Sequence, residues 1–327
     1  MSPAFQGPLA DRFTAFAVLI RSTGGRHVSL LATLGRLDRF LARSCPQATT
    51  LTTEVLWAWF ASFAHLRPAS QARYRTATFQ VCTFLRRRDP ATATREDIPP
   101  RRLARDFHPY LFSPEEIGRF LRAARALRVR RSDPLRPWSM ELLVVLLYTA
   151  GLRIGEAVRL HVRDYDPAAA TLVIRETKFA KPRLVALSTS AQQVLDAYLA
   201  RRQTLGLRGE PTDPLRCCPQ HHAPCVGGTA VALTRLLRRC GLKPLRGRAG
   251  PRVHDIRHAF AVHRVLQWYR HGHDVQALLP RLVTYMGHRG LESTQRYLTL
   301  TPAVLHEAGA RFETFAARSA PARQVTP

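Results

Sequence analysis

A proline-rich stretch near residue 100 sets the first limit on how this chain folds. Pro90, Pro99, Pro100 and Pro109 lie close together and are interspersed with arginines. Proline fixes φ and lacks a backbone N–H donor, so the stretch favours extended chain. The sequence therefore predicts two domains joined by a basic linker. The expected bounds are 1–90 for a helical N-terminal domain, 91–110 for the linker, 111–316 for a larger domain and 317–327 for a disordered tail.

Hydrophobic periodicity predicts mostly helix on both sides of this linker. Apolar residues recur at three- and four-residue spacing throughout the first domain, which is typical of amphipathic helices. The expected helices there are 11–22, 30–43, 52–66 and 70–87. In the larger domain they are 113–127, 138–150, 154–160, 190–202, 229–240, 253–268, a helix beginning near 291, and 303–316. Only 171–175 and 184–187, with a third run at 162–165, indicate strands. The predicted fold class is therefore mainly α with a small antiparallel β-sheet (α+β).

The charge of the chain points to a polyanionic partner. Lysine and arginine number 50 against 23 acidic residues, a formal net charge of +27. Such an excess is typical of proteins that bind nucleic acid or an anionic membrane. The longest apolar run, near Leu142–Leu147, is too short to span a bilayer, and no basic-then-apolar signal peptide opens the chain. We therefore expect a cytoplasmic protein whose partner is nucleic acid, with no membrane association.

Two motifs near the C-terminus concentrate polar groups that suit phosphate chemistry. A helix at 253–268 would place His254, Arg257 and His258 on one face. That face is either a solvated basic surface or an anion site, because a guanidinium matches phosphate oxygens and an imidazole transfers protons near neutral pH. Further along, a break at Gly287-His288 is followed nine residues later by Tyr297.

This order of residues resembles the tyrosine recombinase family, also called the lambda-integrase or phage integrase family, which shares its catalytic domain with type IB topoisomerases. The pattern HxxR, then Gly-His, then Tyr is matched here, and its upstream parts are similar to Gly151–Glu156 and Thr177–Arg183. The segment 297–312 further resembles bacterial mobile-element integrases encoded together with sibling recombinases. The resemblance implies a helical core-binding N-terminal domain and a catalytic domain at 111–316. It also implies a catalytic set, namely Arg153, Lys178, His254, Arg257, His288 and the nucleophile Tyr297, with Glu156 and His258 in support.

Each residue type in that set suits one part of phosphodiester cleavage. Paired guanidiniums at Arg153 and Arg257 would stabilise the charge that grows on the non-bridging oxygens. Tyr297 would attack phosphorus and keep the bond energy in a covalent link. Lys178 would protonate the leaving 5′-oxygen; it is one of only three lysines, with Lys181 and Lys243, in a chain that otherwise uses arginine. His254 and His288 would contact the phosphate oxygens and help manage the tyrosine proton. We expect no cofactor and no metal.

Several arginines outside this set are candidates for DNA contact. They lie on the predicted helix 70–87 and in the linker: Arg73, Arg75, Arg86, Arg87, Arg101 and Arg102. A solvated basic face is the alternative interpretation of the helix. The resemblance implies double-stranded DNA as partner and a homo- or hetero-tetramer assembled on it, with sibling recombinases among the candidate subunits and the nucleoid as the place of action.

Some alternatives stay open at the level of sequence. A type IB topoisomerase-like enzyme would relax DNA with the same residues, and an accessory DNA-binding protein would keep the fold without cutting. The apolar stripe at 303–316 packs either on a neighbouring protomer or on its own domain. The cluster Cys217–Cys225 contains cysteines and histidines, but its spacing matches no standard zinc pattern, so a loop is favoured over a metal site.

Overall fold

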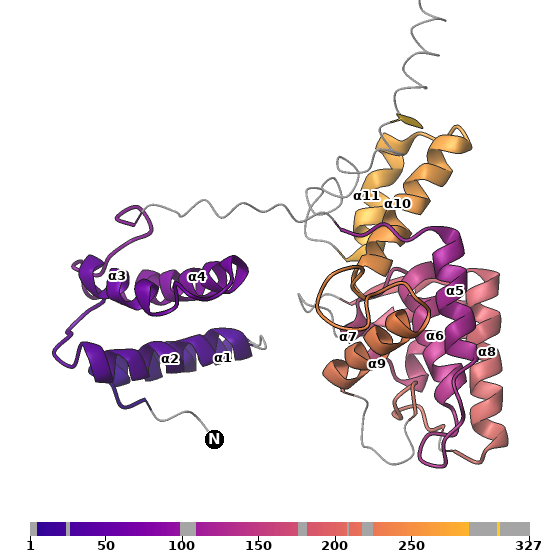
Figure 1. Ribbon diagram of the computed structural model, residues 1–327, viewed down its shortest axis with the longest axis horizontal. Coiled ribbons are helices and arrows are strands. Elements are labelled where there is room, and N and C mark those ends of the chain that lie inside the picture. Colours follow the sequence, from indigo (N-terminus) through magenta and orange to yellow (C-terminus); the bar gives the residue numbers. More distant parts are fainter. Residues whose placement is uncertain are drawn as a thin grey trace, which may run out of the picture. The chain divides into compact units, whose positions relative to one another are not determined.

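The computed structural model describes residues 5–23, 27–98, 109–175, 182–207, 209–217, 225–287 and 306–307. The chain divides into two compact units, Met1–Asp106 and Phe107–Pro327. Within the described residues, no helix is long and apolar enough to cross a membrane. The fold is mainly helical with one small antiparallel sheet, which confirms the predicted fold class (Figure 1).

The first unit contains four described helices, α1 (Ala10–Ser22), α2 (Val28–Ser44), α3 (Thr53–Ser62) and α4 (Pro68–Leu85). Helix α2 packs against α1 and α4. The start of α3 follows from its sequence, because the Thr52 side chain accepts a hydrogen bond from the backbone N–H of Val55. Phe13, Leu37 and Leu41 are fully or almost fully buried in the core of this unit.

The core of the first unit extends past the expected boundary at residue 90. The backbone N–H of Ala93 donates to Leu51 O at 2.9 Å. The hydroxyls of Thr50 and Thr92 hydrogen-bond at 2.7 Å, and Ile98 is completely buried. Residues up to 98 therefore belong to the packed N-terminal unit, and the domain bounds given above remain predictions.

The second unit is built around helix α6 (Arg136–Thr149). This helix contacts α5 (Pro114–Arg125), α8 (Thr189–Thr204), α10 (Asp255–Arg270) and α7 (Ile154–Val158). The run Leu142–Leu147 is buried within it, as its unbroken apolar sequence predicts. A capping box opens α5, because Ser113 and Glu116 exchange both of its hydrogen bonds. Helix α9 (Val226–Arg239) packs against α5 and α7.

A three-stranded antiparallel sheet of order β1-β2-β3 follows α7. Its strands are β1 (Tyr165–Asp166), β2 (Thr171–Ile174) and β3 (Arg183–Ala186), with Leu172 opposite Val185. The expected strand at 162–165 is wrong for most of its length. Val162–Asp164 form a 3₁₀ turn, closed by a hydrogen bond from the His161 backbone N–H to the Asp164 carboxylate, and pairing begins only at Tyr165.

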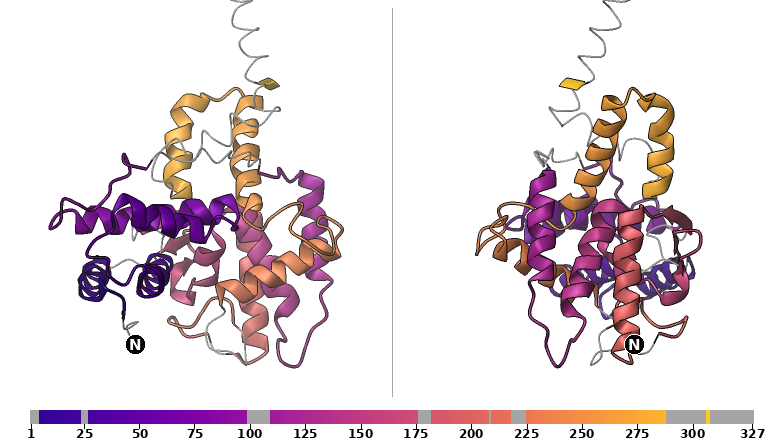
Figure 2. Two further views of the ribbon diagram at one scale, coloured as in Figure 1. Left: turned by 60° about the vertical axis from the view of Figure 1, so that its left-hand side comes forward. Right: turned by 90° about the vertical axis from the view of Figure 1, so that its right-hand side faces the viewer.

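Helix α11 (Val275–Met286) is not among the helices expected from the sequence. It contains Pro280, which normally interrupts a helix. The helix runs side by side with α10 (Figures 1 and 2), and Val275, Leu279 and Leu282 join α10 in one apolar cluster. Tertiary packing therefore stabilises a helix that its local sequence disfavours.

Candidate active site

The site is centred on the buried carboxylate of Glu156, which three guanidiniums approach. Glu156 Oε1 accepts from Arg153 Nη1 at 2.7 Å and from Arg183 Nη1 at 3.1 Å. Glu156 Oε2 accepts from Arg183 Nη2 at 2.8 Å and lies 3.9 Å from Arg257 Nη1. Burial would raise the pKa of Glu156, but the hydrogen bonds and charge of Arg183, together with those of Arg153, lower that pKa to about 2. The carboxylate is therefore ionised at neutral pH, and the four side chains carry a net charge of about +2.

The turn before α7 places Arg153 beside this carboxylate. Gly151 ends the α6 region with φ +58, and the backbone N–H of Arg153 donates to Glu156 Oε2 at 3.0 Å. A Cβ on Gly151 would lie only 2.4 Å from Phe260 Cδ1. Glycine is thus required both by the left-handed backbone and by the packing of α10 against the turn.

The same three arginines hold the C-terminal end of α11. Arg183 Nε donates to Tyr285 O at 2.8 Å, Arg257 Nη2 donates to Met286 O, and Arg153 Nη2 donates to Gly287 O at 2.9 Å. The last carbonyls of a helix lack partners within the helix and carry partial negative charge. The three guanidiniums therefore bind three consecutive carbonyls, and residue 288 follows directly after them in the sequence.

Helix α10 brings His254, Arg257 and His258 to the site, as the spacing predicts. A solvated basic face is the wrong interpretation for Arg257 and His258, which are only 2% and 5% exposed, whereas His254 at the start of the helix is exposed. Arg257 also donates to Gly151 O, which joins α10 to the turn before α7. The rings of His254 and His258 pack edge to face, with centroids 4.8 Å apart.

Both imidazoles of this pair have a lowered pKa, which favours their neutral form. Burial, with the charge of Arg257 next, lowers the pKa of His254. Burial, followed by the charge of His254, lowers the pKa of His258 to about 4. Each neutral ring offers one N–H donor and one acceptor nitrogen, so the pair can hydrogen-bond a ligand oxygen or accept a proton.

Lys243 fixes the loop that leads into His254. Its ammonium donates to four consecutive carbonyls, those of Arg248, Ala249, Gly250 and Pro251, at 2.6–3.4 Å. The side chain is 8% exposed. Sequence reasoning named Lys243 only as one of three lysines, and this role depends on a loop conformation that no local pattern indicates.

Arg183 is the member of the site that sequence reasoning missed. The family resemblance assigns a role to Lys178 in the segment 177–183 and none to Arg183. The signal was its register on the strand, because Arg183 lies two residues before the fully buried Val185 and shares its face of β3. The glycine at 287 fits this contact, since a Cβ there would lie 2.9 Å from Arg183 Nη1.

Part of the predicted set falls outside the described residues. Lys178, His288 and Tyr297 lie there, as do Arg101, Arg102 and the stripe at 303–316 apart from residues 306–307. Glu307 is paired with Arg270 of α10 at 3.1 Å. Most of the Cys217–Cys225 cluster is also outside. Within the described part of the chain, no three metal-binding side chains come together.

The arginines predicted for DNA contact in the first unit lie on or just after α4. Arg75 stacks over Phe60 with 4.2 Å from its Cζ to the ring centroid, and Arg73 lies 5.0 Å from the Tyr74 ring. Arg86 donates to Thr92 O at 2.9 Å, and Arg87 is exposed.

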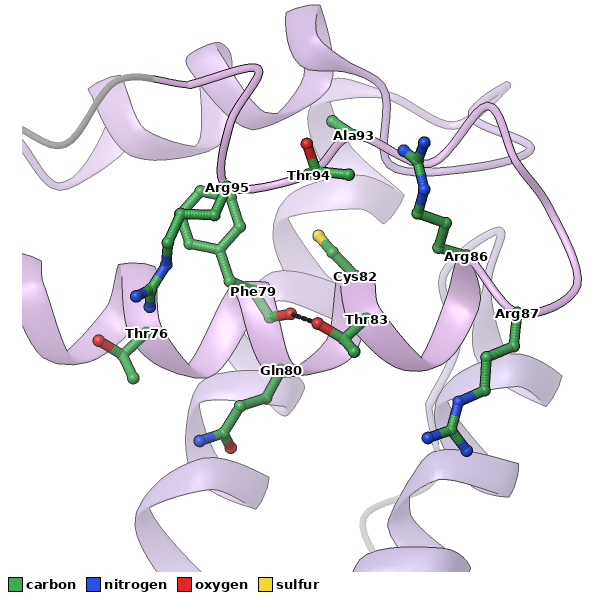
Figure 3. Close-up of a pocket in the computed structure, with 10 residues that line it drawn as sticks. All are labelled: Thr76, Phe79, Gln80, Cys82, Thr83, Arg86, Arg87, Ala93, Thr94 and Arg95. Carbon is green, nitrogen blue, oxygen red and sulfur yellow. Dashed lines mark hydrogen bonds between the residues drawn. The ribbon is translucent and has the colours of Figure 1, made fainter.

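Two of these arginines border a cavity of about 670 Å³ at the end of α4 (Figure 3). Arg95 lies on one side of it and Arg86 and Arg87 on the other, with Phe79 and Cys82 between them. Arg95, which lies 5.6 Å from the Phe79 ring, was not singled out from the sequence. The rim of this cavity is therefore basic.

The family model for the phage integrase family matches residues 112–303. The chain belongs to the phage integrase family. The match contains the whole cluster around Glu156, and it confirms the resemblance to tyrosine recombinases.

Individual relatives agree with this assignment. A Sinorhizobium fredii protein named as an integrase/recombinase, y4rB, is 38% identical over 268 residues, which cover 80% of this chain and 84% of that protein. The tyrosine recombinase XerD of Mycobacterium leprae is 32% identical over 242 residues, covering 71% of this chain and 68% of that protein.

Solved structures share the fold at low identity. The integrase of transposon Tn1549, in complex with transposon right end DNA, has a TM-score of 0.64 at 17% identity and covers 93% of this chain and 99% of its own. A lambda integrase dimer bound to a core site has a TM-score of 0.60 at 14% identity, over 88% of this chain and 76% of its own.

Proposed function

We propose that this protein is a site-specific DNA recombinase that cuts and rejoins DNA through a 3′-phosphotyrosyl intermediate, without metal or ATP. The observation that carries the proposal is the cluster of Arg153, Arg183 and Arg257 around one ionised carboxylate, beside two neutral imidazoles. A net charge of about +2 complements a phosphodiester anion and its more highly charged transition state. Family membership supports the same activity.

In the proposed reaction, Tyr297 supplies the nucleophile. Its phenolic oxygen attacks phosphorus and forms a phosphotyrosine bond, while the bond from phosphorus to the 5′-oxygen breaks. Arg153 and Arg257 stabilise the charge on the non-bridging oxygens, and Lys178 protonates the leaving oxygen. His254 and His288 contact the phosphate, with Glu156 and His258 in support. Attack by a 5′-hydroxyl on the phosphotyrosine reverses the step and rejoins the strand.

Double-stranded DNA is the proposed substrate and partner. The net charge of +27 favours a polyanion, and the neighbouring folds of known structure include recombinases bound to DNA. In this proposal Arg73, Arg75, Arg86 and Arg87 contact backbone phosphates, together with Arg101 and Arg102 of the linker. Strand exchange would take place in a tetramer on two duplexes, with identical or sibling subunits, on the nucleoid DNA of the cytoplasm.

A nicked duplex from the ends of the encoding element tests the proposal. The nick lets the cut fragment diffuse away, so a covalent intermediate accumulates. We expect wild-type protein, without metal or ATP, to form a protein–DNA adduct that survives denaturation, and Tyr297→Phe to form none. Tight, salt-sensitive binding without any adduct would contradict the proposal and favour an accessory DNA-binding protein. Relaxation of supercoiled DNA without exchange between duplexes would favour a topoisomerase-like enzyme.

A further inference from the structure

Arg183 differs from Arg153 in how completely its guanidinium is hydrogen-bonded and buried within the cluster. All three of its nitrogens donate, two to Glu156 and one to Tyr285 O. Its side chain is 9% exposed, whereas that of Arg153 is 20% exposed. Arg183 therefore uses three of its five N–H groups within the cluster and exposes little of its side chain to a phosphate, while Arg153 keeps a more accessible edge.

The charge balance of the cluster depends on this engagement. Glu156 carries one negative charge, and Arg183 makes two hydrogen bonds to it at 2.8 and 3.1 Å. Without Arg183, the carboxylate would be balanced by Arg153 and Arg257 alone, and the net charge near the phosphate would fall from about +2 to about +1. The remaining arginines would then have to neutralise a carboxylate as well as a phosphodiester.

We propose that Arg183 is a positioning residue for the cleavage reaction: it neutralises Glu156, so that Arg153 and Arg257 keep their charge for the scissile phosphate, and it fixes the turn that precedes His288. This inference rests on the proposed function. Arg183 acts through Glu156 and through the end of α11, and it does not touch the reacting atoms.

The second part of the role rests on the contacts with α11. Arg183 is the first residue of β3, which follows the segment that contains Lys178 in the sequence, and its Nε donates to Tyr285 O. It also lies against Gly287, where a Cβ would be 2.9 Å from Nη1 and 3.1 Å from Cζ. One planar fork thus joins β3, α7 and the end of α11. A lysine ammonium would keep the charge, but it lacks the paired donors that reach both carboxylate oxygens and a carbonyl.

Three variants separate the charge of Arg183 from its packing. Arg183→Gln removes the charge, Arg183→Lys keeps it, and the double variant Arg183→Gln/Glu156→Gln removes both partners and restores the net charge of +2. Arg175→Gln is the matched control, because Arg175, directly after β2, pairs with the buried Asp164 at 2.7 Å and lies outside the cluster. Thermal unfolding of each variant shows whether it folds.

The measurement is the single-turnover rate of adduct formation on the nicked duplex at saturating DNA, with affinity measured separately. We expect Arg183→Gln to slow adduct formation by about 10²- to 10³-fold, the range for loss of one preorganised electrostatic group, while DNA affinity changes by less than about tenfold. The double variant should recover at least about tenfold of that rate, and Arg183→Lys should be intermediate. Arg175→Gln should react at the wild-type rate.

The outcomes separate this inference from the proposed function. Absence of adduct with wild-type protein would overturn the proposed function. Normal adduct with wild type and an equal rate for Arg183→Gln would overturn only the role of Arg183. A double variant that folds but is no faster than Arg183→Gln would also overturn it, because a purely structural contact is not repaired by removing its partner. If Arg183→Gln fails to fold, Arg183→Lys and the double variant decide by the same comparison.

Discussion

Replacement of Gly151 by alanine tests how the turn before α7 is built. Gly151 has φ +58, and the new Cβ would lie 2.4 Å from Phe260 Cδ1 and 2.7 Å from Cε1. A left-handed conformation costs an alanine about 1–2 kcal/mol. Forcing a methyl group against a packed ring adds about 1–3 kcal/mol. We therefore expect Gly151→Ala to lower the free energy of unfolding of the second unit by about 2–5 kcal/mol.

Gly206 offers a matched control in the same unit. Its φ is +62, nearly that of Gly151, but a Cβ there would meet nothing within 4 Å. Gly206→Ala should therefore cost only the conformational part, about 1–2 kcal/mol. The difference between the two variants isolates the contact with Phe260, because both substitutions change the unfolded chain equally.

Urea-induced unfolding followed by far-UV circular dichroism measures both variants. The transition that both substitutions shift belongs to the second unit. A double variant with Phe260→Leu should recover about 1–2 kcal/mol of the Gly151→Ala loss, beyond the sum of the single effects. Equal losses for Gly151→Ala and Gly206→Ala would refute the steric argument. Since Gly151 O accepts from Arg257, the Gly151 variant should also slow adduct formation.

Three further predictions concern the same unit. Burial lowers the pKa of His258 to about 4, so between that value and its unfolded pKa of about 6.5 only the unfolded chain binds the proton. The free energy of unfolding should therefore fall by about 2 kcal/mol between pH 7 and pH 5. Urea titrations at the two pH values measure this fall, and His258→Gln should remove most of it. Lys243→Met leaves four carbonyls without their shared donor and should cost about 1–3 kcal/mol, measured by thermal unfolding, with no loss contradicting the contacts described. Ser113→Ala removes the cap of α5 and should cost about 1 kcal/mol in the same assay, whereas Ser190→Ala, outside any cap contact with backbone, should change stability little.

Features with a local physical cause could be predicted from the sequence. The capping box at Ser113, the cap at Thr52 and the helical face that joins His254 to Arg257 each depend on residues three or four apart. Such signals are complete within one turn of chain, so a single sequence contains them.

Features with a distant cause could not be predicted in the same way. Helix α11 exists despite Pro280 because its apolar face packs on α10. Arg183 meets Glu156 and Tyr285 across 27 and 102 residues of chain, so the sequence indicated at most that it shares the buried face of β3. Whether His258 was solvated or buried likewise depended on the elements that cover α10, and only the structure decides it.

The anchoring of three guanidiniums at the end of α11 has a consequence for biosynthesis. The contacts from Arg153 to Gly287 and from Arg183 to Tyr285 span 134 and 102 residues. During vectorial synthesis the arginines leave the ribosome long before the carbonyls that orient them. A nascent chain that ends between Arg257 and Tyr285 therefore carries all three positive charges but lacks the carbonyls at the end of α11. The arginine cluster around Glu156 is thus among the last parts of the protein to assemble.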